Sequence, residues 1–148
     1  MVETHCAGWR ELDPATAYAV LRLRVDVFVV EQQCPYPELD GRDVEPEAVH
    51  VWATHGAEVV GCLRILHDDG VRRIGRVCVR SDHRGQGVAA LLVDTALGLC
   101  AGDEVVLDAQ SYLRGWYARF GFDVAGPEFD EDGIAHVPMR RSAGWPKG

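Results

Sequence analysis

The chain has 148 residues, of which 47% are hydrophobic and 26% charged, a balance that is typical of globular proteins. Its formal net charge of −8 disfavours nucleic acid as a partner, because nucleic-acid binding normally requires a basic surface. No apolar run approaches the roughly 20 residues that cross a bilayer, and the first residues lack the basic and apolar parts of a signal peptide. We therefore expect one domain over residues 1–148, located in the cytoplasm and without membrane contact.

The first half of the chain predicts a helix, a loop and three strands. Asp13-Pro14 is typical of a helix start, and the apolar residues that follow lie on roughly one face as far as about Val30. Residues 33–46 contain three prolines and Gly41, which predicts an irregular loop. Strands are then expected over residues 49–54, 58–66 and 71–79, and Gly75 indicates a bulge or a close backbone approach.

The second half predicts two helices and three strands. The apolar spacing indicates a helix over residues 87–100, which Gly102 ends, and a buried strand over residues 104–109. A helix over residues 112–120 and strands over residues 122–129 and 136–141 complete the chain. This order of elements predicts an α+β fold with a mixed sheet.

The cysteines do not predict a metal site. They are Cys6, Cys34, Cys62, Cys78 and Cys100, widely spaced and without a C-x-x-C pair. All but Cys34 lie in or beside apolar or strand-like stretches, where thiols usually act as small core residues. We therefore expect no metal cofactor.

The loop Arg84-Gly85-Gln86-Gly87 lies between a predicted strand and a predicted helix. Consecutive amides at such a helix start form an anion site, and the glycines let the backbone approach a diphosphate. A nucleotide P-loop is excluded because no Gly-Lys-Ser/Thr follows. The dinucleotide fingerprint is matched by Gly85-x-Gly87-x-x-Ala90, with Asp108 downstream for a ribose. In that fold, however, the glycines directly follow the strand and the motif opens the domain. Here five polar residues separate Val79 from Gly85 and about 84 residues precede the motif, which disfavours a dinucleotide site.

Several motifs in order resemble one known family. Arg84-x-x-Gly87-x-Ala89 is similar to the R/Q-x-x-G-x-G/A signature of the GCN5-related N-acetyltransferases (GNAT), and Tyr117-x-x-x-Gly121-Phe122 to their Y-x-x-x-G-F element. The segment from Phe28 to Tyr36, together with Ala109-Gln110 and residues 131–134, resembles the ElaA-like branch. These matches span about residues 18–140.

The resemblance implies a mixed, mostly antiparallel central sheet of six to seven strands, flanked by helices. In this family the fourth and fifth strands splay apart, and the pantetheine arm of acetyl-CoA enters the gap. The implied contacts to acetyl-CoA are the backbone of Val77, Cys78 and Val79, the loop residues Arg84, Gly85, Gln86, Gly87, Val88 and Ala89, and the residues Gln110 and Tyr117.

The resemblance also implies roles for Tyr117 and Glu31. Periodicity alone gives Tyr117 a packing role, because Leu113, Trp116, Tyr117 and Phe120 form a helical core stripe. The family motif instead implies that its phenol protonates the departing thiolate. For the base that takes the amine proton, Glu31 is expected, with Glu128, His136 and solvent as alternatives.

Charge is distributed unevenly, and this bears on the acceptor. Residues 72–84 include five arginines and one acid, and residues 31–47 include six acids and one arginine. A cleft lined with Glu38, Asp40, Asp43 and Glu45 is expected to attract a cationic amine and to repel a second anion. We therefore expect Phe28, Glu31 and Asp40 to bind a small-molecule or protein amine, which leaves polyamine, lysine and aminoglycoside acceptors open.

Two other functions stay open at this point. Arg24-x-x-x-Phe28 with Asp40 and Asp43 resembles the acyl-homoserine-lactone synthases, which share the fold and use acyl-carrier proteins. The fourth strand offers Arg76 where many GNAT members have a glutamate, which leaves room for a non-catalytic acetyl-CoA sensor. A homodimer is also open, with the final strand as an exposed pairing edge.

Overall fold

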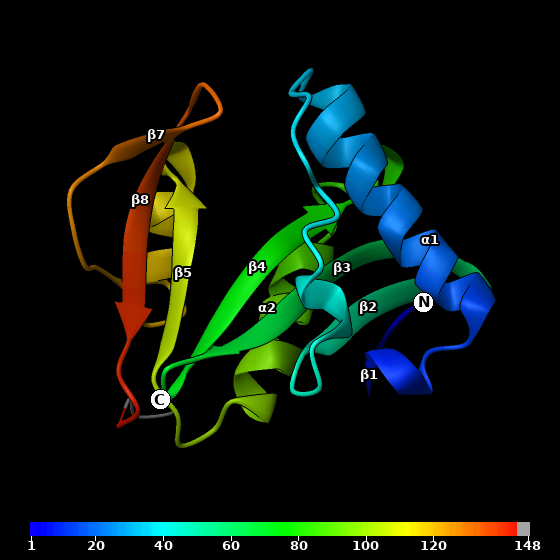
Figure 1. The fold of residues 1–148 in the computed structure, drawn as a ribbon, viewed down its shortest axis with the longest axis horizontal. Coiled ribbons are helices and arrows are strands. Elements are labelled where there is room, and N and C mark those ends of the chain that lie inside the picture. The colour runs from blue at the N-terminus through cyan, green and yellow to red at the C-terminus, as the bar shows by residue number, and fades with distance from the viewer. Residues whose placement is uncertain (145–148) are drawn as a thin grey trace.

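One twisted sheet of eight strands runs through the described residues, 1–144, of the computed structural model (Figure 1). The strand order is β1-β2-β3-β4-β5-β8-β6, with β7 paired to β8, and only the β4–β5 pairing is parallel. The strands are β1 (Val2–Gly8), β2 (Val49–His55), β3 (Glu58–Asp68), β4 (Val71–Val79), β5 (Val105–Gln110), β6 (Asp123–Val124), β7 (Phe129–Glu131) and β8 (Ile134–Arg141).

The helices lie on the two faces of this sheet, with α1 in front and α2 behind in Figure 1. The chain's α-helices are α1 (Pro14–Val25), α2 (Val88–Leu99) and α3 (Arg114–Ala118), and α1 continues as a π-helical segment, η2 (Asp26–Glu31). Short 3₁₀ turns are η1 (Trp9–Glu11), η3 (Arg42–Val44), η4 (Ser81–His83) and η5 (Ser111–Leu113). The expected α+β fold with a mixed, mostly antiparallel sheet is confirmed.

The sequence expectations miss some elements. The sheet has eight strands instead of six to seven, because β1 was not predicted and the strand expected over residues 122–129 is divided into β6 and β7. The helix expected to run to about Val30 is α-helical only to Val25. Cys6 is exposed and Cys34 is buried, the reverse of what their sequence surroundings indicate.

The final strand was also expected to be an exposed pairing edge, and this is wrong. β8 lies between β5 on one side and β6 and β7 on the other, so that its backbone groups are used within the sheet. The strands at the two ends of the strand order are β1 and β6.

Two apolar clusters hold the helices to the sheet. On one face, Val88, Leu92, Val93 and Ala96 of α2 pack into the main core with β2, β3 and β5. On the other face, α1 packs on β3 and β4 through a smaller cluster, Val20, Leu23, Val27, Cys62 and Cys78. Burying one such valine or leucine side chain contributes about 1.5–3 kcal/mol, so the sheet is fixed firmly from both sides.

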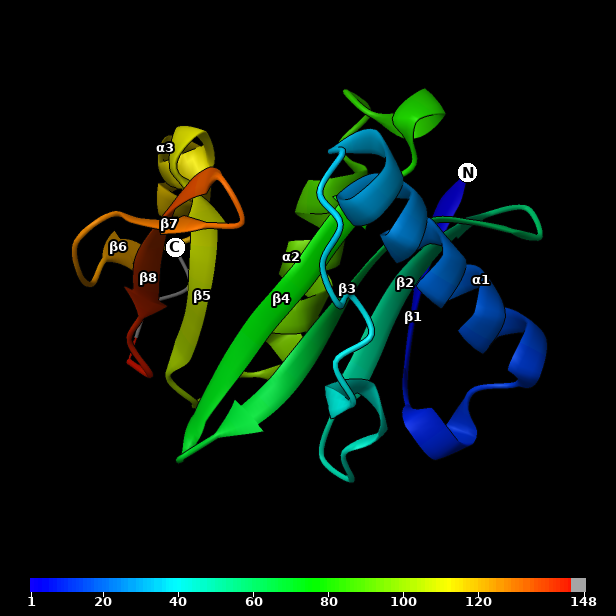
Figure 2. The ribbon, with the colours of Figure 1, turned by 45° about the horizontal axis from the view of Figure 1, so that its top comes forward.

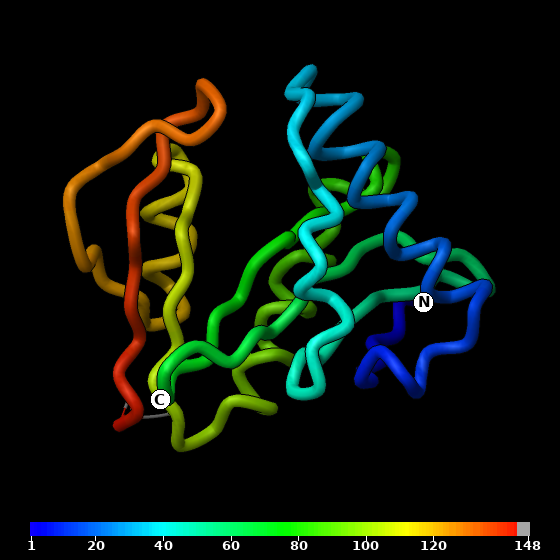
Figure 3. The backbone as a smooth tube through the Cα atoms, in the orientation of Figure 1, coloured from blue at the N-terminus to red at the C-terminus, as the bar shows by residue number. Residues whose placement is uncertain are grey.

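The feature that shapes the site is a divergence of β4 from β5, which Figures 2 and 3 show as a widening gap. Parallel pairing is limited to Arg72↔Val105 and Arg73↔Val106. Just beyond, β4 contains an extra residue relative to β3, because the register changes from Arg64↔Gly75 to Cys62↔Cys78. The bulge indicated by Gly75 is therefore confirmed, although the left-handed backbone belongs to the next residue, Arg76, with φ of 55°.

Candidate active site

A cavity of about 780 Å³ occupies the gap between β4 and β5. It is lined by η2 and the loop that follows it, by β3 and β4, by the loop before α2, by β5 and α3, and by the β7–β8 hairpin. All the predicted site residues except Gln86 line it: Phe28, Glu31, Asp40, Val77, Cys78, Val79, Arg84, Gly85, Gly87, Val88, Ala89, Gln110 and Tyr117.

The edge of β4 faces the cavity with alternate backbone groups. The N–H of Arg80 donates to the carbonyl of Val60 at 2.7 Å, so alternate residues of β4 point their N–H and C=O toward β3. By this alternation Cys78 points to β3, whereas Val79 and Val77 point into the gap. The register thus turns the backbone of Cys78 away from the position expected for it and leaves Val77 and Val79 to face the cavity.

The glycine loop has the conformation that an anion cradle needs. Gly85 and Gly87 have φ of 75° and 80°, a left-handed backbone conformation that residues with a Cβ atom rarely adopt. Gly87 is also the N-cap of α2, whose first turn carries no acidic residue to oppose the positive end of the helix dipole. The backbone amides at the start of α2 can therefore bind an anion that enters the cavity.

Arg84 connects this loop to η2. Its guanidinium forms two hydrogen bonds with Glu31, one of them 2.8 Å from Nη2 to Oε1, and its Nε donates to the carbonyl of Val79 at 3.0 Å. The hydrogen bonds from Arg84 lower the pKa of Glu31. A carboxylate with a lowered pKa is a weaker base, so the structure gives Glu31 an anchoring role and does not favour it as the proton acceptor.

Tyr117 packs in the core and also lines the cavity, so its position is compatible with both the packing role and the proton-donor role considered from the sequence. Its ring packs edge-on against Trp116 and Phe122, and only 6% of the residue is exposed, yet it lines the cavity. No described residue forms a hydrogen bond with its phenol oxygen. Burial raises the pKa of Tyr117 to about 12, so the phenol stays protonated near neutral pH and can donate.

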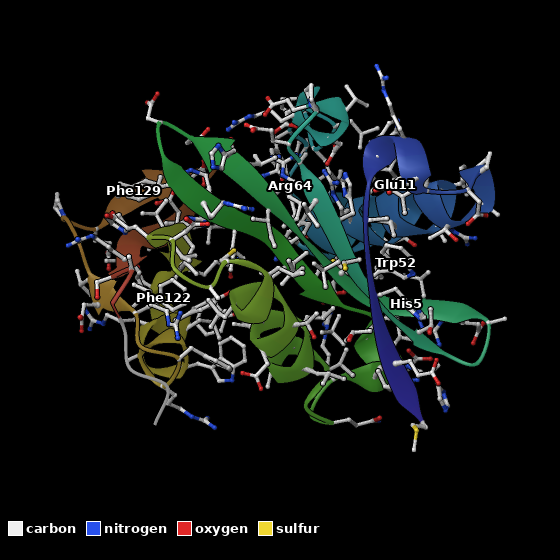
Figure 4. All side chains as sticks on the ribbon, turned by 90° about the horizontal axis from the view of Figure 1, so that it is seen from below. His5, Glu11, Trp52, Arg64, Phe122 and Phe129 are labelled. Carbon is white, nitrogen blue, oxygen red and sulfur yellow. The ribbon has the colours of Figure 1, made fainter. Side chains whose placement is uncertain are left out.

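Three acidic residues of the loop 33–46, Glu38, Asp40 and Asp43, form ion pairs with arginines in a largely buried network. Arg24, 1% exposed, binds Glu38 at 2.7 Å and Asp43 at 2.6 Å. Arg64, which Figure 4 labels on β3, binds Asp40 at 2.6 Å and Asp43 at 3.1 Å.

Arg76 at the bulge completes this network. Its guanidinium binds Glu38 at 2.8 Å and Asp40 at 3.4 Å, and it lies over the ring of Tyr36. Three carboxylates therefore face three guanidinium groups.

The expected acidic cleft is therefore wrong in part. Glu38 and Asp43 are buried, and Glu45 pairs with Arg42 instead of lining the cavity. Asp40 does line the cavity, but hydrogen bonds from Arg64 hold the pKa of its carboxyl far below the usual range and balance its charge. The physical reason is that a carboxylate can be buried only with a matching cation, and the arginines of distant segments supply it.

Arg24 lies at the centre of this buried network, and sequence reasoning considered it only through the resemblance to an alternative family. Its signal is a charged residue between Leu23 and Val27, both of which are buried in the stripe that packs on the sheet. A cation in such a stripe requires buried acids, and the only acid-rich segment nearby in sequence is residues 31–47. The acidic segment thus shapes the cavity wall by holding the loop 33–46 against α1 and β3.

Residues 1–144 contain no group of three or more His, Cys, Asp or Glu side chains placed to hold a metal ion. In the same part of the chain, none of the helices has the length and apolar character to cross a membrane.

The sequence is similar to a protein-family model and to several known proteins. The family model described as "Acetyltransferase (GNAT) domain" matches residues 19–143. The UPF0039 protein Rv2851c of Mycobacterium tuberculosis is 47% identical over 137 residues, covering 89% of this chain and 88% of that one. Protein ElaA of Escherichia coli is 37% identical over 148 residues, covering 95% and 97%.

Solved structures of related proteins have the same fold as this chain. An acyl-CoA N-acyltransferase from Pseudomonas aeruginosa superimposes with a TM-score of 0.92 at 36% identity, covering 96% of this chain and all of that one. The crystal structure of Escherichia coli ElaA gives 0.91 at 36% identity with the same coverage. The gap between β4 and β5, the glycine loop and these matches together show that the chain belongs to the GNAT acetyltransferase family and resembles its ElaA-like members.

Proposed function

We propose that this protein transfers an acetyl group from acetyl-CoA to a primary amine by direct attack within a ternary complex. The observation that carries the proposal is the meeting of three features in one cavity: the unpaired edge of β4, the glycine loop before α2 and the phenol of Tyr117. Each matches a different part of an acyl-CoA thioester.

The donor half of the cavity consists of the β4 edge, the Gly85–Gly87 loop and Tyr117. An extended pantetheine arm can pair with the gap-facing backbone groups of Val77 and with the N–H of Val79, as an added strand does, whereas the carbonyl of Val79 accepts from Arg84. The CoA diphosphate is suited to the amides at the start of α2. The same fold carries CoA in an aminoglycoside 6′-N-acetyltransferase complexed with coenzyme A, which is 13% identical with a TM-score of 0.72.

The proposed reaction uses fixed donors at both ends of the breaking bond. A gap-facing amide of Val77 or Val79 polarises the thioester carbonyl and stabilises the oxyanion that forms when the amine attacks. The C–S bond then breaks as the C–N bond is completed, and Tyr117 donates its phenolic proton to the departing thiolate. The amide nitrogen loses a proton that restores the phenol.

The acceptor half consists of η2, the loop 33–46 and the β7–β8 hairpin. Because the ion network neutralises Asp40, the charge that could attract an amine comes from other lining carboxylates. Asp108, Glu131 and Asp132 line the cavity, and the side chains of Asp108 and Glu131 are 40% and 58% exposed. These groups favour a cationic amine over an anionic acceptor.

A thiol-release assay tests the proposal. Acetyl-CoA is incubated with the protein and with 1,5-diaminopentane, spermidine, a lysine-containing peptide or kanamycin, and free CoA is measured; acetyl-acyl-carrier protein is run as the competing donor. We expect CoA release with at least one amine and none with the carrier-protein donor. Absence of thiol release with every amine would overturn the proposed activity.

The second candidate function is an acetyl-CoA sensor. It is favoured by two arginine pairings in the cavity: Glu31 is held by Arg84, and β4 presents Arg76 in place of a carboxylate. Calorimetry separates the two functions, because a sensor binds acetyl-CoA without releasing thiol to any amine. For either function we propose a cytoplasmic location with no nucleic-acid partner, and a homodimer stays a proposal that light scattering can test.

A further inference from the structure

His136 of β8 is fixed in the cavity wall by contacts on two sides. Its Nδ1 lies 2.8 Å from the carbonyl oxygen of Ile134, and because a carbonyl can only accept, this nitrogen carries the proton. Its ring stacks on Phe129 with centroids 5.8 Å apart and planes 24° apart, and its side chain is 12% exposed. The neutral imidazole therefore presents the lone pair of Nε2 in a defined orientation.

The sheet places His136 on the face from which an acceptor would approach. His136 is directly opposite Gln110 in the β5–β8 register, and the neighbours Val137 and Ala109 point the other way into the main core. Figure 4 shows Phe129, its stacking partner, on the side of the sheet that carries α1, with Phe122 on the side of α2. The glycine loop leads into α2, so this loop and His136 lie on opposite faces of the gap.

Several titratable groups surround His136. From β7, Glu131 places Oε2 at 3.8 Å from Nε2. At the hairpin tip, the carbonyl of Asp132 accepts from the Cys34 thiol at 3.5 Å, which holds the hairpin against the loop 33–46. On β5, Asp108 lies two residues from the Gln110 position, and its carboxylate is 3.5 Å from Arg73.

Three other candidate bases of the cavity, Glu31, Asp40 and His83, are already engaged. Glu31 is bound by Arg84 and Asp40 by Arg64. His83 has a partner at each ring nitrogen, Asp82 at 2.9 Å and His55 at 3.3 Å. In contrast, Nε2 of His136 lies 3.8 Å from Glu131 Oε2, beyond hydrogen-bond distance, so its lone pair can accept a proton from an amine beside both groups.

We propose that His136 is the general base of the reaction and that Glu131 stabilises the imidazolium it forms. This inference rests on the proposed acetyl transfer. The acceptor ammonium gives one proton to Nε2 of His136, the freed nitrogen lone pair attacks the thioester carbon, and the C–S bond breaks. The imidazolium then releases its proton to solvent past Glu131, so that one ammonium and one thioester yield one amide, one thiol and one proton.

The test compares two kinds of acceptor in the variant His136→Gln. With the alkylamine of the panel that has the fastest wild-type turnover, kcat/KM should fall at least about a hundredfold, the usual size of a general-base contribution. Hydroxylamine is largely unprotonated at neutral pH and needs no base, so its rate should fall much less. The Kd for acetyl-CoA, measured by calorimetry, should stay within about twofold, because His136 lies on the opposite face of the gap from the donor loop.

The pH profile gives a readout that a merely structural role would not move. The kcat/KM of the wild type should depend less steeply on pH than that of His136→Gln, because the wild type also uses the ammonium form of the acceptor. In His136→Gln only free amine reacts, so kcat/KM should rise about tenfold for each pH unit below the pKa of the amine. A variant with the same pH dependence as the wild type would overturn the base assignment, and a wild type that releases no thiol would overturn the proposed function as well.

Two further variants guard against misfolding. His136→Ala should regain activity when free imidazole is added to the assay, which a misfolded protein would not do, and failure of rescue in a folded variant would count against the base. His67→Gln is the matched control, because His67 also has a carboxylate neighbour, Glu47 at 3.1 Å, but does not line the cavity. Its activity should equal the wild type.

Discussion

The two halves of the cavity are built from different parts of the polypeptide. The donor half is made mainly of backbone: the free edge of β4 and the left-handed glycines before α2. The acceptor half is made of side chains, with the loop 33–46 held by Arg24, Arg64 and Arg76. Backbone conformation is determined by local sequence, whereas paired charges depend on residues far apart in the chain, so the two halves should respond differently to substitution.

The largest effect is expected in the ion network of the acceptor half. Arg24→Met removes the cation between two buried carboxylates, and breaking a buried pair in this way destabilises by about 3–5 kcal/mol. Urea denaturation measures this free energy of unfolding. The matched control is Arg22→Ala, whose side chain is 71% exposed and 3.8 Å from Asp26, and which should change stability by less than about 0.5 kcal/mol. Equal losses in both variants would show that Arg24 is not the centre of the network.

The next effect concerns the donor half. Gly87→Ala forces a Cβ into a backbone with φ of 80°, which costs about 1–3 kcal/mol and disturbs the amides at the start of α2. We expect the Kd of acetyl-CoA to rise about tenfold or more, measured by calorimetry. Gly98→Ala, in open space within α2, should instead stabilise the protein by about 0.5–1 kcal/mol and leave the Kd unchanged.

The role of Tyr117 can be sharpened by removing only its hydroxyl. Tyr117→Phe keeps the ring in its contacts with Trp116 and Phe122, so the fold should persist. Turnover with the best amine should fall at least about tenfold, because the thiolate leaves without a proton donor. Tyr18→Phe, at a residue that is 70% exposed on α1, is the control for the loss of a hydroxyl. Wild-type turnover in Tyr117→Phe would remove the acid role.

The smallest effect is a pH dependence of stability from Asp40. Its folded-state pKa is depressed by hydrogen bonds from Arg64, so its contribution is present above the unfolded pKa of about 3.9 and is lost as pH falls below it. The Tm of the wild type should therefore decrease between about pH 5 and pH 3 more steeply than that of Asp40→Asn. Parallel curves for the two proteins would mean that Asp40 is not coupled to folding.

Local signals in the sequence predicted much of the donor half. Gly75 marked the bulge, and the spacing of Gly85 and Gly87 between a strand and a helix marked the loop. These predictions succeeded because a left-handed turn or a bulge requires glycine at or beside a particular position, whatever the remainder of the chain does. At the bulge itself the positive φ belongs to Arg76 and not to Gly75, so the glycine indicated the position of the bulge only to within one residue.

The acceptor half could not be predicted in the same way. The acidic stretch was expected to form an open cleft, yet Glu38 and Asp43 are buried beneath arginines from α1, β3 and β4. The expectation for β8 failed for a related reason, because β6 and β7 cover an edge that its own sequence leaves open. Which groups neutralise or cover one another is decided by long-range pairing.

By itself, the sequence determined the family, the α+β order of elements, the glycine loop before α2 and the placement of Tyr117 beside the core. Each depends on contiguous residues whose spacing sets a backbone conformation or one face of a helix. Only the tertiary structure decided that Glu31 is bound by Arg84, that Asp40 is neutralised and that His136 faces the gap. Those outcomes depend on electrostatic partners and strand register, which are set when segments distant in the chain are brought together.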